Sequence, residues 1–386
     1  MILVVLTILS TTIGVLATLR LFQWRAITPN KSGCKIGVSI IKPIRGLEPD
    51  LETNLHSFFN LQTKIPFELL LCIQDPNDPA IEVINKLLEM HSNVNARLFT
   101  NAKPFGKNPK VSNMHVAWRE AIYDLALISD SNVRVPPDYL DLLLAERIRG
   151  ADLVTQAVYG ADGRGFGGHL DVIHLNTFYL KATGFLEIFG YHNVLGKCML
   201  LSRGHFEELG GLRSVRNYLA EDLVSGDRMR EAGYEIKIAP QLLRQTSVIT
   251  SFSGYWKRHV RWARLRKCHV PLAYASEPLL FETFWPPLLI LLNPTSNSIL
   301  VAEACLIFQI ASNAALHQFK LRDSGAWKSF SWFIIKDVLA PIIWIGGLVS
   351  NKVHWRGHTL YLRYGGRLVS KYRRNSSLEW LRRIAS

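Results

Sequence analysis

The chain has few charged residues and few cysteines for its length, and each shortage excludes a class of protein. Only 20% of its 386 residues are charged while 48% are hydrophobic, which excludes a disordered or low-complexity protein. The five cysteines form no C-x-x-C pair, and most stand in apolar runs: Cys34, Cys72, Cys198, Cys268 and Cys305. We therefore expect buried cysteines in a reducing compartment, and neither a disulfide framework nor a zinc site.

Residues 1–19 contain no charge at all. As a helix they would cover about 28 Å, enough for the hydrocarbon core of a bilayer. Positive charges follow this run, at Arg20 and Arg25, instead of preceding it, and no small-residue cleavage site is evident, which disfavours a cleaved signal peptide. We predict a transmembrane anchor over 1–22, with its N-terminus outside and the following residues in the cytoplasm.

Acidic residues are almost absent from 351–386, which hold nine Lys or Arg and one acid, giving +8 of the chain's net +14. Such a basic tail is expected on the cytoplasmic side, in contact with anionic lipid. If the central domain and the tail both lie in the cytoplasm, the segments between them must cross the bilayer an even number of times. Within the predicted membrane segments at 278–350, we expect two full spans plus one re-entrant or interfacial segment, drawn from 283–296, 298–316 and 331–350. A nucleic-acid-binding protein would instead spread its basic residues, with aromatics, over 33–250.

Residues 33–275 are predicted to form one cytoplasmic α/β domain. Short apolar runs, typical of strands covered on both faces, alternate with helical patterns such as 79–90, 114–122 and 137–147. The runs are 36–42, 67–74, 96–99, 123–129, 152–159, 198–202 and 235–239. This alternation favours a mainly parallel sheet, whose ligand site lies at the carboxyl ends of the strands.

Acidic and amide side chains follow two of these strands. Asp75 comes after 67–74, while Asp130 and Asn132 come after 123–129. Such groups suit a nucleotide diphosphate, because one can accept hydrogen bonds from a base or ribose and another can bind a divalent cation. Each aspartate could instead cap the turn that follows its strand.

Two further segments carry charged groups at predicted helix N-termini. In GKNPKVSN, Lys107 and Lys110 precede the helix at 114–122, which indicates either an anion site or a solvated basic loop. Glu221 and Asp222 open a helix over 221–232. First-turn acids are stabilised by the helix dipole, but one of them could also be a general base within reach of a substrate hydroxyl.

A basic helical stretch begins near Ser253. Its spacing places Arg258, Arg261 and Trp262 on one face, where arginine can bind phosphate and tryptophan can form a flat wall. With six Lys or Arg and no acid over 257–267, it could equally be a cationic helix on the bilayer surface. Upstream, the apolar segment 178–190 is either a membrane contact or a core helix, and His192 is a candidate acceptor contact.

The ordered set of these motifs resembles the D, D, D, (Q/R)xxRW pattern of family 2-type glycosyltransferases. The closer resemblance is to the ceramide glucosyltransferases of glycosyltransferase family 21. It is carried by VSIIKPIRGLEPDLETNLHSFF (38–59), LLLCIQDPNDPAIEVINKLL (69–88), NVNARLF (93–99), NPKVSNM (108–114), ISDSNVRVPPDYL (128–140), GKCMLLSR (196–203), LAEDLVSGDRM (219–229), RHVRWARLR (258–266) and HWRGHTLYLRYGG (354–366).

The resemblance implies a GT-A fold and a membrane-bound hexosyltransferase with its catalytic domain on the cytoplasmic face. The implied donor is a UDP-sugar, foremost UDP-glucose, and the implied acceptor is a ceramide-like lipid, glycosylated with inversion at the anomeric carbon. A hopanoid or glycerolipid acceptor with UDP-glucose or UDP-GlcNAc, and a processive polysaccharide synthase, stay open as alternatives.

The resemblance also assigns roles to residues. Asp75 would contact the uridine, Asp130 with Asn132 would hold Mg²⁺ or Mn²⁺, and Asp222 would be the base. The wider superfamily has a D-x-D metal motif, and Asn132 replaces its second aspartate. The diphosphate would be bound by Arg258, Arg261 and Trp262. Independently of the resemblance, Lys110 is a candidate ligand of the diphosphate, and His192 and Glu221 are candidate acceptor contacts.

Overall fold

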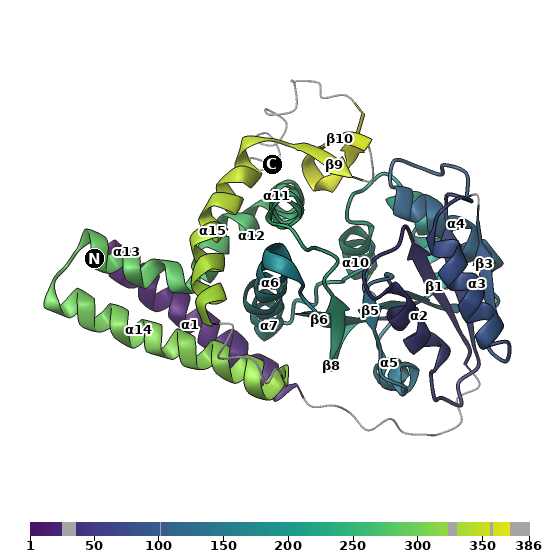
Figure 1. The fold of residues 1–386 in the computed structure, drawn as a ribbon, viewed down its shortest axis with the longest axis horizontal. Helices are drawn as coiled ribbons and strands as arrows, with labels where there is room; N and C mark the ends of the chain where they lie inside the picture. The colour runs from purple at the N-terminus through teal and green to yellow at the C-terminus, as the bar shows by residue number, and fades with distance from the viewer. Residues whose placement is uncertain (25–35, 101, 323–329, 356–357, 371–386) are drawn as a thin grey trace. The chain divides into compact units, whose positions relative to one another are not determined.

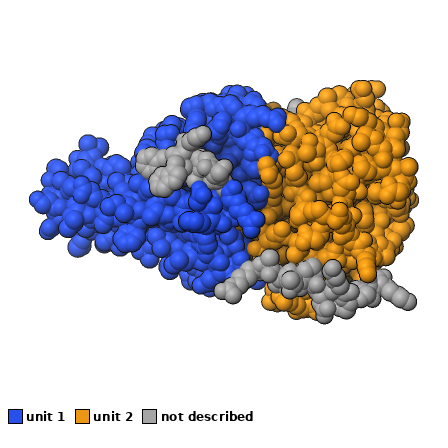
Figure 2. Space-filling view, turned by 60° about the horizontal axis from the view of Figure 1, so that its bottom comes forward, with its two compact units in different colours: residues 1–25, 159–192, 249–351 blue, residues 26–158, 193–248, 352–386 orange. Residues whose placement is uncertain are grey.

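The computed structural model describes residues 1–24, 36–100, 102–322, 330–355 and 358–370. The chain divides into two compact units, which Figure 2 colours separately. Unit 1 comprises 1–25, 159–192 and 249–351, and unit 2 comprises 26–158, 193–248 and 352–386. These boundaries differ from the predicted domain at 33–275, because 159–192 and 249–275 group with the terminal helices while the C-terminal segment groups with the sheet.

Unit 2 is built on an eight-stranded sheet with strand order β3-β2-β1-β4-β7-β6-β8-β5. Its first half is parallel, as predicted: β1 (Val38–Ile44) pairs with β2 (Phe67–Ile73) and β4 (Leu125–Ile128), and β3 (Ala96–Phe99) pairs with β2. The second half contains antiparallel pairs, which apolar runs alone do not reveal. It comprises β5 (Val133–Arg134), β6 (Leu153–Ala161), β7 (Met199–Ser202) and β8 (Ile236–Thr246).

Both faces of the parallel strands are covered, because every residue of β1 is buried. Successive residues Ile40 and Ile41 belong to two separate apolar clusters, one on each face of the sheet. The covering helices of unit 2 are α2 (Leu51–Phe59), α3 (Ala80–Met90), α4 (Pro109–Glu120), α5 (Tyr139–Ile148), α8 (Arg203–Glu208), α9 (Gly211–Val215) and α10 (Glu221–Glu231). Helix α4 begins five residues before the predicted start, because Asn108 caps it and Pro109 occupies its first position.

A small second sheet was not predicted, because its short strands lie in the segment taken for a tail. It pairs β9 (Lys352–Trp355), β10 (His358–Leu362) and β11 (Leu368–Val369) in antiparallel fashion. The Leu368 amide donates to the Asn217 carbonyl at 2.7 Å, and the Leu219 amide donates to the Gly366 carbonyl. The second sheet therefore supports the loop that leads into α10. Residues 371–386 of the predicted basic tail lie outside the described residues.

Unit 1 is helical. Among the described residues, three helices are long and apolar enough to cross a membrane: Ile2–Gln23, Ser296–Lys320 and Ser331–Val349. A shorter apolar helix covers Glu282–Leu292. Two of the long helices and the short one lie within 278–350. Which of them cross a bilayer, and in which orientation, stays a prediction.

Figure 1 shows α1 (Ile2–Gln23), α13 (Trp285–Leu292) and α14 (Ser296–Ala315) running side by side, with mutual contacts. The remaining regular elements of unit 1 are α6 (Gly165–His174), η1 (Leu175–Tyr179), α7 (Leu180–Ile188), α11 (Phe252–His269), α12 (Pro271–Ser276), η2 (Glu277–Leu280), η3 (Glu282–Phe284), η4 (Leu316–Lys320) and α15 (Phe330–Val349).

The apolar segment 178–190 is mostly helical, over η1 and α7, and packs against α1, the predicted membrane anchor, while Ile188 and Phe189 at its end are exposed. This packing is compatible with both a membrane contact and a core helix. A β-carbon added to Gly184 of α7 would lie 2.9 Å from Leu21 Cγ and 3.0 Å from the Ala17 carbonyl oxygen of α1. Glycine therefore permits the close approach of these two helices.

Replacing Gly184 with valine is expected to lower the free energy of unfolding by about 1–3 kcal/mol, because the added atoms overlap α1. Thermal unfolding of the detergent-solubilised protein measures the change. Ala182→Val, on the same helix at a half-buried position, is the matched control and should unfold closer to the parent temperature. Equal unfolding temperatures for Gly184→Val and the parent would contradict the close packing.

Four of the five cysteines, Cys72, Cys198, Cys268 and Cys305, are free thiols in buried positions, as predicted. Cys34 lies outside the described residues.

Candidate active site

The candidate active site gathers where the parallel half of the sheet ends. Asp130 and Asn132 follow β4, and Lys110 lies in the first turn of α4. Gly196 and Lys197 precede β7, and Glu221 and Asp222 open α10. All these positions belong to unit 2.

Asp130 is held by two lysines, one on each carboxylate oxygen. Lys110 Nζ lies 2.7 Å from Oδ1, and Lys197 Nζ lies 2.7 Å from Oδ2. The same Lys197 ammonium donates to Asn132 Oδ1, also at 2.7 Å. Burial alone would raise the pKa of Asp130, but Lys110 and Lys197 hold it well below its usual value. Asp130 therefore stays ionised over the whole physiological range.

A third lysine, Lys42 of β1, lies beneath this pair. Its Nζ donates to the Asp130 carbonyl oxygen at 2.6 Å and lies 3.6 Å from the centre of the Phe58 ring. The side chain is completely buried, and burial lowers its pKa well below the usual value. Lys42 thus fixes the backbone that carries Asp130.

Residues 108–110 (Asn-Pro-Lys), here called the NPK segment, connect α4 to α10. The Asn108 side chain accepts hydrogen bonds from the Lys110 and Val111 amides and donates to Glu221 Oε2 at 3.0 Å. Lys110 Nζ lies 2.7 Å from Glu221 Oε1. Burial would lower the pKa of Lys110, but the surrounding carboxylates raise it above its usual value. Lys110 is therefore a charged bridge between Asp130 and Glu221, and it is not a solvated loop residue.

Asp222 is placed differently from its neighbour, since no cation pairs with it directly among the described residues. Its Oδ2 accepts a hydrogen bond from the Gly196 amide at 2.6 Å, and its Oδ1 accepts one from the Leu223 amide. Burial, and then the charge of Glu221, raise the pKa of Asp222 to about 6, against the opposing effect of Lys110. A half-buried carboxylate with such a pKa is a good general base near neutral pH.

Gly196 fits tightly into this cluster. A β-carbon at this position would lie 2.7 Å from Lys110 Nζ and 3.0 Å from Asp222 Oδ2. The glycine therefore allows the Lys197 loop to approach both charged groups. Gly196 and Lys197 stand in a stretch that carries the family resemblance, yet sequence reasoning singled out neither of them.

Asp75 is exposed in the turn after β2. Its Oδ1 accepts a hydrogen bond from the Asn77 amide at 2.9 Å, and its carbonyl accepts one from the Asp78 amide. It thus caps its own turn, as the alternative interpretation expected. One strand, β1, separates β2 from β4, so their carboxyl ends are about 10 Å apart at the same edge of the sheet. This edge brings Asp130 and Asp222 together through Lys110 and Gly196, whereas Asp75 has no contact with them.

The predicted diphosphate ligands on α11 belong to unit 1. The Arg258 guanidinium lies 4.4 Å from the centre of the Trp262 ring, so these two side chains share a face as predicted. Arg258 Nη1 also pairs with Asp171 Oδ2 at 3.2 Å, and His259 Nε2 pairs with Asp171 Oδ1 at 2.9 Å. Asp171 is completely buried, and the sequence contained no signal for it.

Helix α11 also packs against α6 and α15, so one of its faces is internal and only the remainder could meet a bilayer surface. Arg261 is half-buried on the same helix. Its predicted meeting with the carboxylates of unit 2, like that of Arg258 and Trp262, stays a prediction.

His192 lies near a charged group at the end of α7. Its Nε2 is 4.0 Å from Glu187 Oε1, and the other oxygen of Glu187 accepts hydrogen bonds from Arg20 Nε and Trp24 Nε1. The contact of His192 with an acceptor stays a prediction.

The predicted divalent metal site has a donor set of suitable chemistry. Asp130 and Asn132 offer hard oxygen atoms of the kind that Mg²⁺ and Mn²⁺ bind. Their Oδ2 and Oδ1 atoms converge on one point, because both lie 2.7 Å from the same ammonium nitrogen. Among the described residues, no group of three or more His, Cys, Asp or Glu could hold a metal. A metal here would therefore complete its shell with phosphate and water oxygens.

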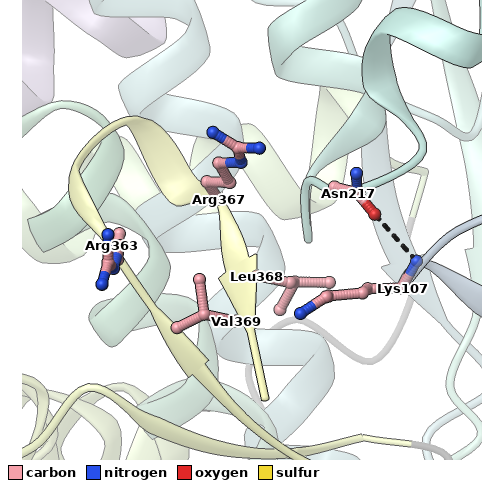
Figure 3. Close-up of a pocket in the computed structure, with 6 residues that line it drawn as sticks. All are labelled: Lys107, Asn217, Arg363, Arg367, Leu368 and Val369. Atoms are coloured by element: carbon pink, nitrogen blue, oxygen red, sulfur yellow. Dashed lines mark hydrogen bonds between the residues drawn. The ribbon is translucent and has the colours of Figure 1, made fainter. Parts of the chain in front are cut away.

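A pocket of about 250 Å³ lies where the second sheet meets the loops before α4 and α10. Figure 3 shows its lining side chains, three of them basic and none acidic: Lys107, Asn217, Arg363, Arg367, Leu368 and Val369. The Lys107 amide donates to Asn217 Oδ1, and Lys107 Nζ donates to Ser370 Oγ at 3.0 Å. Lys107 thus links the second sheet to the residues just before the NPK segment. It takes no part in the ion pairs of Lys110 with Asp130 and Glu221.

A mixed α/β sheet with charged side chains gathered at the ends of its parallel strands is typical of an enzyme that binds an anionic ligand at that edge. The model of one family, described as "Glycosyl transferase family 21", matches residues 2–368, and the chain belongs to this family. The predicted fold class, α/β of the GT-A type with apolar helices at both ends, is confirmed, as is the predicted hexosyltransferase class.

Two relatives are proteins of Caenorhabditis elegans. Ceramide glucosyltransferase 3 is 29% identical over 345 residues, which cover 86% of this chain and 74% of that protein. Ceramide glucosyltransferase 1 is 29% identical over 344 residues, covering 86% and 73%. A solved structure, a mannosyltransferase from Pyrobaculum calidifontis in complex with GDP-Man and Mn2+, is 16% identical, with a TM-score of 0.49, and covers 88% of this chain and 98% of that chain.

Proposed function

We propose that the protein transfers glucose from UDP-glucose to the head-group hydroxyl of a ceramide-like membrane lipid, with inversion at the anomeric carbon. One observation carries this proposal. The same edge of the sheet holds Asp222, a potential base of raised pKa, and Asp130, a carboxylate bound by two lysines. The relatives named ceramide glucosyltransferase support glucose as the sugar and ceramide as the acceptor.

In the proposed reaction, Asp222 accepts the proton of the acceptor hydroxyl. The hydroxyl oxygen forms a bond to C1 of the sugar from the face opposite UDP, while the bond from C1 to the diphosphate oxygen breaks. Negative charge then grows on the leaving diphosphate. Lys110 and Lys197 are the cations of unit 2 that would stabilise this charge in a partly dehydrated site.

The remaining predicted contacts complete the donor site. Asp75 would accept hydrogen bonds from the uridine at the end of β2, two strands from β4, and Arg258, Arg261 and Trp262 would close over the diphosphate. Asp130 and Asn132 would hold a divalent cation, which supplies additional positive charge to the diphosphate when it is bound. Glu221 is committed to Lys110 and Asn108, so we assign it to positioning and not to proton transfer.

The apolar helices give the proposed acceptor a physical setting. A lipid keeps its chains in the bilayer and presents its hydroxyl at the interface, so its transferase must be held close to that surface. The three described helices that could cross a membrane would hold it there. We place the catalytic site on the cytoplasmic side, because the positive charges follow the first helix and gather in the C-terminal segment.

The test is product identification. Membranes containing the protein are incubated with labelled UDP-glucose or UDP-GlcNAc and, separately, ceramide, diacylglycerol or a hopanoid, and the labelled lipid is identified by mass spectrometry. We expect a β-glucosylated ceramide. A labelled hopanoid or glycerolipid would replace the proposed acceptor, and a labelled polymer would indicate a processive synthase.

The pH dependence follows from the raised pKa of Asp222. Since only its ionised form can accept a proton, kcat/KM should fall about tenfold per pH unit below pH 6. An ordinary aspartate would keep the rate level down to about pH 4. Rates measured from pH 4.5 to 8 with saturating lipid decide between the two. A level profile over this range would contradict the assignment of Asp222 as the base.

A further inference from the structure

We propose that the Lys197 ammonium and a divalent cation exchange at one site, the oxygen pair formed by Asp130 Oδ2 and Asn132 Oδ1. Lys197 is then the resident cation of the free protein, and metal binding releases it toward the donor diphosphate. This inference deepens the proposed function and rests on it for the identity of the diphosphate. The exchange itself concerns only residues of unit 2.

The geometry shows that one cation position is shared. Lys197 Nζ lies 2.7 Å from the aspartate oxygen and 2.7 Å from the amide oxygen, so it occupies the point on which the two oxygens converge. A metal placed at this point would lie at about 2.0–2.6 Å from each oxygen and would overlap the ammonium nitrogen. The ammonium and the metal therefore cannot be bound together.

The charges around Asp130 lead to the same conclusion. Its other oxygen is already paired with Lys110, and Lys42 contacts its backbone carbonyl. A divalent ion added beside Lys110 and Lys197 would place three cationic groups around the Asp130 carboxylate, and their mutual repulsion is strong in a partly buried site. Lys110 keeps a second partner, Glu221, whereas the described contacts of Lys197 are to Asp130 and Asn132 alone. Lys197 is thus the cation that leaves.

The site is open enough for this exchange. The side chains of Lys197 and Asp130 retain 17% and 24% of their exposure, so an ion from solvent can reach the carboxylate. The released ammonium stands on a flexible stem and can turn to the phosphate oxygens that complete the metal shell. The exchange predicts weak metal binding by the free protein and tighter binding when the nucleotide is present, because the nucleotide gives Lys197 a new partner.

The test measures metal binding without any sugar transfer. The full-length protein in detergent is titrated with Mn²⁺ in the absence of nucleotide, and unbound Mn²⁺ is followed by electron paramagnetic resonance. Lys197→Met is expected to bind Mn²⁺ about tenfold more tightly than the parent, or better, because the competing ammonium is gone. Lys86→Met is the matched control: it removes one exposed lysine, paired with Glu52 elsewhere in unit 2, and should leave Mn²⁺ affinity unchanged.

A second measurement uses the unaltered protein, so the test does not depend on the folding of a variant. Reductive methylation followed by mass spectrometry compares the labelling of Lys197 with that of Lys86 before and after Mn²⁺ addition. Mn²⁺ should increase the labelling of Lys197 alone. Unchanged or weaker Mn²⁺ binding in Lys197→Met, or Lys197 labelling that Mn²⁺ does not increase, would overturn the exchange. Neither readout involves the sugar or the lipid. If the product assay failed, Mn²⁺ affinity and Lys197 labelling would therefore still test the exchange.

Discussion

Replacing Asp222 with asparagine is expected to lower turnover by about 10²–10⁴-fold, the usual contribution of a general base. The amide keeps the size of the carboxylate and can still accept a hydrogen bond from the Gly196 amide, but it cannot take the proton of the acceptor hydroxyl. UDP binding, measured by calorimetry, should be retained. Burial disfavours the ionised form of Asp222, so the neutral replacement should not lower the unfolding temperature at pH 7.

Asp227→Asn is the matched control for this substitution. Asp227 lies on the same helix, α10, half-buried and paired with Arg230 at 2.9 Å, and its replacement should leave turnover close to that of the parent. Near-normal turnover in Asp222→Asn would contradict the assigned role. If Glu221→Gln alone abolished turnover without loss of stability, the base would be Glu221.

The second large effect is expected from Lys110→Met. This change leaves the Glu221 carboxylate buried without its cation and removes one of the two lysines on Asp130. Breaking a buried ion pair by removing one partner typically costs about 3–5 kcal/mol of stability. Thermal unfolding in detergent measures this loss. Donor binding should weaken as well, because the diphosphate loses a cation in the proposed site.

A double substitution distinguishes the loss of the Lys110–Glu221 ion pair from a nonspecific loss of stability. Adding Glu221→Gln to Lys110→Met removes the unpaired charge, so the double variant should be more stable than Lys110→Met alone. A distinct readout concerns Asp222, whose pKa Lys110 lowers: in Lys110→Met the acid limb of the pH profile should move above pH 6. Unchanged stability together with an unshifted profile would show that Lys110 does not bridge these carboxylates.

The sequence predicted the parallel strands and most of the charged residues of the site. Each parallel strand is a mainly apolar run, and the polar groups that follow it mark where the strand ends. For the same reason Asp130, Asn132, Lys110 and the Glu221–Asp222 pair could be selected one by one. Their contacts could not be predicted, because Lys110 and Glu221 are more than a hundred positions apart, and only the pairing of β1 with β4 brings α4 and Asp130 to one edge.

The residues that sequence reasoning missed share a physical cause. Lys197 stands in an apolar stretch with no acid near it in sequence, and its partners follow another strand. Asp171 pairs with Arg258 and His259 from a different helix, across 87 and 88 positions, and a lone acid in an apolar segment gives no sign of this. The second sheet was missed because its strands are short and lie in the segment taken for a basic tail.

Direct observation of the bound nucleotide tests the central claim most sharply. Electron cryo-microscopy of Asp222→Asn in lipid nanodiscs with UDP-glucose and Mn²⁺ would locate the diphosphate. We expect its density beside Lys110, with Mn²⁺ between Asp130 and Asn132, the uridine toward Asp75 and Asp222→Asn facing the sugar. Diphosphate density bound instead between Arg363 and Arg367 of the second sheet, with Lys110 and Lys197 still paired to Asp130, would contradict this account.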